Sequence, residues 1–140
     1  MKLFLQVFLA LLLLKSASFA YDYTEVQEIE LQKDEQKEIL VKYKDVEKLF
    51  TFRWTLYVND GLVIFRSYDR HVAQNILYLN HKNQSFRVVL KTPGADYYNP
   101  PYILVKFKEF NSKKNSAVFE LYLYDRDLQI KLDYLKNRQR

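Results

Sequence analysis

The segment LFTFRWTLYV, residues 49–58, decides the expected fold of this chain. Apolar side chains occupy every second position from Phe50 to Val58, and Thr, Arg, Thr and Tyr fill the positions between them. Because successive side chains of a strand point to opposite faces, this rhythm predicts a strand with one buried and one wet face. The expected core face consists of Phe50, Phe52, Trp54, Leu56 and Val58, and the outward face includes Arg53 and Tyr57.

A turn and a second strand are expected directly after this segment. Asn59-Asp60-Gly61 is a strong hairpin signal, because all three residue types tolerate a positive φ. Residues 62–68 then return as the partner strand. Further alternating runs, separated by polar turns, occupy residues 76–79, 86–90, 103–108, 119–124 and 128–134.

Residues 26–50 allow two interpretations. The stretch is rich in Glu, Lys and Gln, which favour helix. However, Ile29 and Leu31 alternate with Glu, and the apolar residues of 39–43 alternate with Lys. We expect two strands joined by the charged turn 33–38, and a helix is the alternative.

Eight or nine short strands in a single chain of this length predict an all-β domain. An antiparallel β-sandwich of immunoglobulin-like architecture is expected, with Trp54 as a core plug between the sheets. The chain has no cysteine, so the disulfide of that architecture is absent and the likeness is one of architecture alone. A small closed β-barrel is the alternative.

The N-terminal residues are typical of a secretory signal peptide. Lys2 precedes the apolar run 3–14, and Ser18-Phe19-Ala20 places small residues at the −3 and −1 positions, so we expect cleavage between Ala20 and Tyr21. Twelve helical residues span about 18 Å, too short for a hydrocarbon core of about 30 Å. An uncleaved anchor is the alternative. Residues 21–135 would form a single domain without a transmembrane span, and the basic tail 136–140 is expected to fray.

The charge is unevenly distributed along the chain. The formal net charge is +5. Residues 21–48 carry nine acidic and five basic side chains, a net charge of −4, whereas residues 49–140 carry eight and fifteen, a net charge of +7. Export to a periplasmic or extracellular space argues against nucleic acid, so the expected partner is a protein or an anionic envelope polymer. An ordinary solvated surface is the alternative interpretation.

The sequence favours no catalytic or cofactor site. His71 and His81 lie in separate polar stretches, no Ser occupies a G-x-S-x-G elbow, and the two glycines form no phosphate loop. Asp125 and Asp127 flank Arg126 in a turn, where carboxylates commonly accept backbone N–H groups. We therefore expect no enzyme, no metal and no cofactor.

Two candidate binding surfaces emerge instead. The stretch TPGADYYNPPY, residues 92–102, holds all three prolines, and its candidate residues are Asp96, Tyr97, Tyr98 and Tyr102. Alternatively, these tyrosines cover the open end of the core. The second surface is an outward sheet face with Arg53, Tyr57, Lys106 and Lys108, joined by Arg87, Tyr122 and Tyr124. Its alternative is an ordinary wet face.

The expected function is that of an exported, non-catalytic binding or assembly module that recognises a protein or an anionic envelope polymer. A tyrosine-rich loop or a free sheet edge would make the contact. The alternative is a carrier of a small apolar ligand, held inside a β-barrel or between the sheets.

Overall fold

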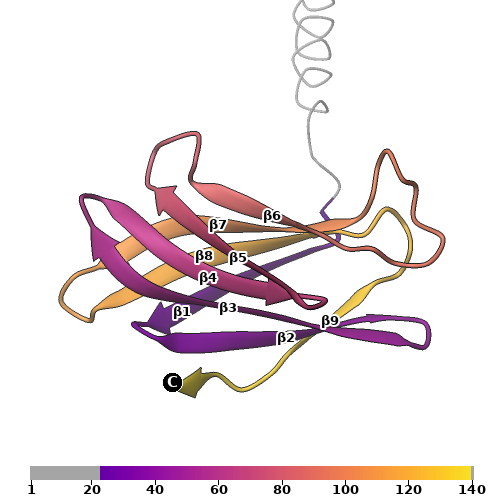
Figure 1. Cartoon of the computed structure of the whole chain (residues 1–140), viewed down its shortest axis with the longest axis horizontal. Helices are drawn as coiled ribbons and strands as arrows, with labels where there is room; N and C mark the ends of the chain where they lie inside the picture. The colour runs from indigo at the N-terminus through magenta and orange to yellow at the C-terminus, as the bar shows by residue number, and fades with distance from the viewer. Residues whose placement is uncertain (1–22, 140) are drawn as a thin grey trace, which may run out of the picture.

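A computed structural model describes residues 23–139, which form ten strands and no helix (Figure 1). Within residues 23–139 there is no helix that is long and apolar enough to cross a bilayer. The expected signal peptide and its cleavage site lie outside the described residues. The strands are β1 (Glu25–Gln32), β2 (Glu35–Tyr43), β3 (Val46–Val58), β4 (Gly61–Tyr68), β5 (His71–Tyr78), β6 (Ser85–Val89), β7 (Tyr102–Asn111), β8 (Ser116–Tyr124), β9 (Lys131–Tyr134) and β10 (Arg138–Gln139).

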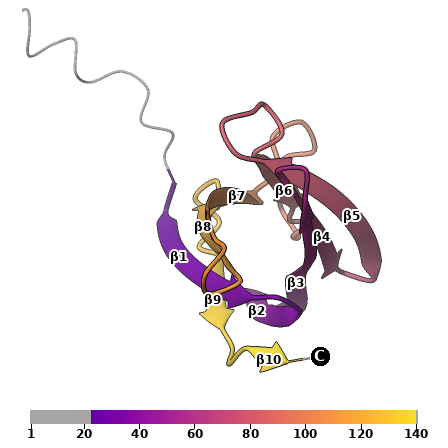
Figure 2. The same ribbon diagram turned by 90° about the vertical axis from the view of Figure 1, so that its left-hand side faces the viewer.

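The strands form two antiparallel sheets that pack face to face (Figures 1 and 2). One sheet has the order β1-β8-β7-β6. The other runs β2-β3-β4-β5, and β9 and β10 both pair with the outer edge of β2. The predicted antiparallel β-sandwich is confirmed, and the described strands do not close into a barrel. The helical alternative for residues 26–50 is wrong, because β1 and β2 occupy them.

Aromatic side chains from both sheets fill the core. The rings of Phe52 on β3 and Phe119 on β8 meet edge to face, with centroids 5.3 Å apart. Phe50 stacks beside Phe52 at 5.6 Å. Trp54 is 1% exposed, and its indole Nε1–H donates to the Leu31 carbonyl at 2.8 Å. Trp54 is therefore the core plug that the sequence predicts, with its one polar group satisfied.

A β-bulge interrupts the alternation of β3. The register shifts between Trp54 and Leu56, so that the side chains after Thr55 change face. Leu56 and Val58, which we expected in the core, are 49% and 50% exposed. Tyr57, which we expected outside, packs against the core instead.

A second bulge lies in β7, where the register shifts between Phe107 and Glu109. It turns Phe110 toward the core, and the Phe110 ring stacks on that of Tyr57 with a centroid distance of 3.9 Å. The two bulges, one in each sheet, thus direct a pair of aromatic rings toward each other. A strict two-residue rhythm could not predict this contact, because it counts no extra residue in either strand.

The β3–β4 turn follows its sequence signal, whereas the charged turn expected at 33–38 is confined to residues 33 and 34, because β2 begins at Glu35. Asn59 and Asp60 adopt φ of 50° and 62° in the tight β3–β4 turn. A Cβ on Gly61 would lie 3.0 Å from the side chains of Ile76 and Tyr78, so any larger residue would require these side chains to shift. β5 is longer than expected and begins at His71, and β9 is shorter because Gln129, at φ 56°, falls in the preceding turn.

The C-terminal end does not fray as expected. Arg138 and Gln139 form β10 and pair with Gln36 and Glu35 of β2. Arg138 also forms an ion pair with Glu38, whose carboxylate is almost fully buried. Partners about a hundred residues away in sequence, on β2, therefore hold Arg138 and Gln139.

Candidate functional site

The loop between β6 and β7 is held by its own backbone. Leu90 N–H donates to the Pro101 carbonyl at 2.8 Å, which closes the base of the loop. Within it, Ala95 N–H donates to the Thr92 carbonyl, and the Asp96 carboxylate accepts Tyr98 N–H at 3.0 Å. Gly94 adopts a φ of 80°, which side-chain-bearing residues rarely reach. These turns, together with three prolines, make the loop an ordered platform.

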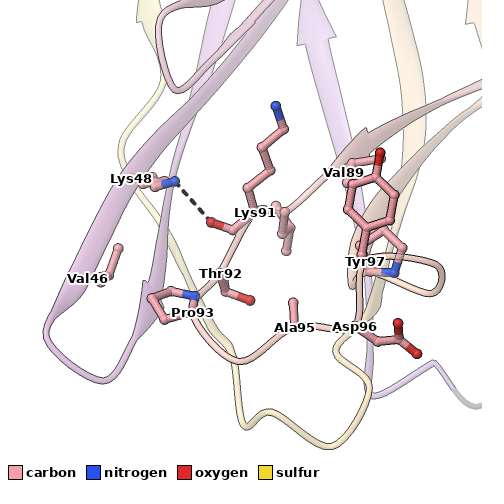
Figure 3. Close-up of a pocket in the computed structure, with 11 residues that line it drawn as sticks. Val46, Lys48, Val89, Lys91, Thr92, Pro93, Ala95, Asp96 and Tyr97 are labelled. Atoms are coloured by element: carbon pink, nitrogen blue, oxygen red, sulfur yellow. Dashed lines mark hydrogen bonds between the residues drawn. The ribbon is translucent and has the colours of Figure 1, made fainter.

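A cleft of about 650 Å³ lies between this loop and the first half of β3 (Figure 3). Most of its surface is apolar, and a volume of this size is ordinary for a ligand pocket. The β2–β3 turn and the loop lie at the same end of the sandwich (Figure 1). The lining residues are Val46, Lys48, Val89, Leu90, Lys91, Thr92, Pro93, Ala95, Asp96, Tyr97 and Pro100.

Lys48 fastens the loop to β3. Its ammonium group donates to the Lys91 carbonyl at 3.1 Å and pairs with the Asp69 carboxylate at 3.0 Å (Figure 3). The hydrogen bond from Lys48 holds the pKa of Asp69 below its usual value. One cation therefore joins three segments at this end of the sandwich: β3, the β4–β5 turn and the loop.

Tyr97 and Tyr98 are the most exposed large side chains of the loop, at 89% and 91%. Their rings meet edge to face at 5.4 Å. The interpretation that the loop tyrosines cover the core is therefore wrong for these two residues. Tyr102 differs, because it is buried in β7 on the outer face of the four-stranded sheet, beneath the Arg87 guanidinium at 4.0 Å.

Two buried hydroxyl groups near Lys48 have no hydrogen-bond partner. Thr92, a cleft residue, is 8% exposed and its Oγ1 is unpaired. Tyr68 is also buried, its hydroxyl is unpaired, and its ring centroid lies 6.0 Å from the Lys48 ammonium. Burial, with a smaller effect from Asp69, raises the pKa of Tyr68 to about 12. Buried side-chain polar atoms without a hydrogen-bond partner are uncommon in folded proteins.

The outward face that we predicted as a second surface is divided by the fold. The four-stranded sheet carries five of its members on one outer face: Arg87, Lys106, Lys108, Tyr122 and Tyr124. Arg53 lies in the opposite sheet, over the Phe65 ring. The β3 bulge turns Tyr57 to the core. The seven residues therefore form no single surface.

The outer face of the four-stranded sheet is also not basic. Lys108 pairs with Glu28 at 2.6 Å, and Lys106 lies directly opposite Glu120 in the register. What remains is an aromatic cluster, in which the Tyr124 ring lies 5.2 Å from that of Tyr102. Acidic side chains therefore lie among the cations of this face, which weakens its attraction for an anionic polymer.

The six-stranded sheet carries an apolar outer face that the sequence did not predict. Its exposed members lie on β3, β4 and β5 and comprise Leu56, Val58, Phe65, Val72 and Ile76. Two of them reach this face through the β3 bulge. A signal for this face was present in β5, where Val72 and Ile76 lie on the same side of the strand as Gln74. Whether that side points outward depends on the pairing of β5 with β4.

The histidines stand apart from the cleft. His71 begins β5, and His81 lies in the β5–β6 turn, where its Nδ1 accepts the Asn83 N–H. Across residues 23–139, no three His, Cys, Asp or Glu side chains gather in a way that would hold a metal ion. Asp125 accepts the Asp127 N–H, as expected for a turn.

No family model, curated protein or solved structure matches this chain. Its function must therefore be inferred from the cleft, the loop and the sheet faces. Among these, the cleft and its neighbouring tyrosines combine a cavity, exposed aromatic rings and an unpaired polar group in one place.

Proposed function

We propose that this protein is an exported, non-catalytic binding module that holds a partner protein through the β6–β7 loop. The N-terminal sequence supports export to the periplasm or the cell exterior. The observation that carries the proposal is the near-complete exposure of Tyr97 and Tyr98 beside an apolar cleft. Exposed tyrosines next to a pocket are typical of contact points in protein interfaces, since they bury a large area at a small loss of side-chain entropy.

A protein partner is favoured over an anionic polymer by the charges on the surface. A polymer would need an extended array of cations on one face, but the fold divides the predicted basic face between the two sheets, and Lys108 within it is paired with Glu28. Binding without catalysis is favoured by the chemistry of the cleft. Among the described residues, Asp96 is the one carboxylate that lines the cleft, and it already accepts a backbone N–H. Neither His71 nor His81 lines the cleft.

The cleft itself supports a second candidate, a carrier of a small apolar ligand. Its volume and apolar lining suit such a ligand. The space between the sheets does not, because aromatic rings from both sheets meet there at contact distance. A carrier would therefore hold its ligand under the loop, and native mass spectrometry of the purified protein would reveal it as a bound adduct.

Site-directed photocrosslinking in intact cells tests the proposal. A crosslinking amino acid at position 98 is expected to trap one discrete protein, whereas the same group at Lys113, in the exposed β7–β8 turn, is expected to trap none. Tyr97→Ser, with the crosslinker at position 98, should reduce the yield. Equal yields from both positions, or no protein adduct at position 98, would refute a protein-binding loop.

A further inference from the structure

We infer that the cleft receives the C-terminal end of the partner's chain, with its last apolar side chains inside and its carboxylate beside Lys91. This inference rests on the proposed function and names the part of the partner that is bound. Three features of the cleft support it: one side is closed, its lining carries an unpaired cation, and the exposed tyrosines extend beyond it.

The closed side favours a chain end over the middle of a chain. The hydrogen bond from Lys48 to the Lys91 carbonyl ties the loop to β3 across one side of the cleft (Figure 3). Pro93 and Val46 lie next to this tie, on the same side. A peptide that ran through the cleft would have to break the tie, whereas a chain that stops there leaves it intact.

The charges of the cleft lining favour a carboxylate. Lys48 already shares its charge with Asp69, but the Lys91 ammonium has no ion-pair partner within residues 23–139. The cleft's own carboxylate, Asp96, lies away from Lys48 and is occupied by the Tyr98 N–H (Figure 3). An incoming anion would therefore meet the Lys91 ammonium, while Asp96, the carboxylate that lines the cleft, is already hydrogen-bonded.

Thr92 supplies a hydrogen-bonding group that the free protein does not use. Its Oγ1 is shielded from solvent and unpaired, and the residue lies between Pro93 and Ala95 in the cleft lining (Figure 3). A shielded hydroxyl without a hydrogen bond costs free energy. A small shift of the loop that lets this hydroxyl bond to a partner's carboxylate or amide would regain that free energy. The unmet hydrogen bond thus favours the bound form of the loop.

The exposed tyrosines favour a peptide over a small acid. Tyr97 lines the cleft, whereas Tyr98 lies beyond it and is 91% exposed. A small amphiphilic acid would fill the cleft and leave Tyr98 in water. A peptide that continues outward from the cleft would cover Tyr98 as well, which gives that residue a role.

Fluorescent peptides test the inference directly. A set of short peptides that end in Val, Leu or Phe is titrated into the full-length mature protein, once as free acids and once as C-terminal amides. The acids are expected to bind about three- to tenfold more tightly than the amides, as for one charge-assisted contact near the surface. Lys91→Gln should abolish this difference, and Lys82→Gln, a matched lysine in the exposed β5–β6 turn, should preserve it.

Thr92→Val provides a second readout that does not depend on charge. It keeps the side-chain shape and removes the unpaired hydroxyl, so the melting temperature should hold or rise while peptide affinity falls. A variant that lost affinity only because it failed to fold would show a lower melting temperature.

The outcomes separate the inference from the proposed function. Equal affinity of acids and amides, or binding of decanoate in preference to every peptide, would overturn the C-terminal inference. In either case a protein crosslinked at position 98 would leave the binding module in place. Absence of that crosslink would instead remove the proposed function on which the inference rests.

Discussion

At the scale of single residues, two of the four unpaired buried polar groups within residues 23–139 lie near Lys48 at the cleft end of the sandwich, and the other two are the Tyr134 hydroxyl and the Arg126 Nε. The Trp54 indole finds the Leu31 carbonyl, whereas the hydroxyls of Thr92 and Tyr68 find no partner. Unpaired buried hydroxyls reduce stability, and they commonly persist where binding requires them. The same end of the molecule carries the cleft and the exposed tyrosines.

Tyr68 gives a prediction for alkaline pH. Its pKa of about 12 exceeds the ordinary value near 10, because the folded chain disfavours the phenolate. The unfolded chain releases this proton first, so the contribution of Tyr68 to stability should be constant below pH 10 and be lost as the pH rises from 10 to 12. Tyr68→Phe should reduce this loss and raise stability at neutral pH by about 1 kcal/mol.

Urea denaturation at neutral and alkaline pH measures both effects of Tyr68→Phe. Tyr97→Phe, at an exposed position, is the control and should leave the curve unchanged. A variant curve that overlays the wild-type curve at every pH would show that Tyr68 keeps its hydroxyl hydrated.

At the scale of elements, the bulges decide which side chains the two longest strands bury. In β3, Trp54 faces inward, the extra residue Thr55 shifts the register, and Leu56 faces outward. The bulge in β7 has the same effect, so that Phe110 meets Tyr57. Each bulge turns inward an aromatic ring that strict alternation would point to solvent, Tyr57 in β3 and Phe110 in β7.

The β3 bulge predicts unequal costs for two leucines that strict alternation assigns to the core. Leu56→Ala should cost less than about 1 kcal/mol, because half of that side chain is already exposed. Leu62→Ala, at a position with 0% exposure, should cost about 2–5 kcal/mol. Both losses are measured by chemical denaturation of otherwise identical proteins. Similar large losses would mean that β3 continues without a bulge and buries Leu56.

At the scale of the whole molecule, the C-terminal segment completes the sheet that β2 begins. β9 and β10 pair with successive parts of β2, and Arg138 neutralises the buried Glu38 carboxylate at 3.3 Å. Lys37 also donates to Asn137 and to the Leu135 carbonyl. The residues joined by these two hydrogen bonds are 98 and 100 positions apart in the sequence, so the contacts connect the two ends of the domain.

Removal of residues 136–140 should therefore destabilise the protein, despite their charge and position at the end of the chain. We expect a loss of about 1–3 kcal/mol, because Glu38 would lose its cation and β2 would lose part of an edge partner. Thermal and urea unfolding measure this loss. Lys136→Ala is the control for charge alone and should change stability little. A truncated protein as stable as the full chain would show that β10 contributes nothing.

Much of the fold was predictable from the sequence, and less of the site was. The two-residue rhythm of Phe50, Phe52 and Trp54 depends only on local geometry, as does the Asn59-Asp60 turn, and both were confirmed. The loop 92–102 stood out by its prolines and tyrosines, yet the sequence could not distinguish exposed Tyr98 from buried Tyr102. That difference arises from the neighbours that the four-stranded sheet gives to Tyr102.

The sequence by itself determined the all-β class, the hairpin turns and the position of the proline-rich loop, because each depends on residues close together in the chain. Only the tertiary structure decided the cleft, whose walls come from β3 and from a loop some forty residues later, joined by Lys48. It also decided which outward residues share a face, since strand order and bulges are set by pairing between distant segments. Local alternation sorts side chains to two faces, but the packing of two sheets determines what each face meets.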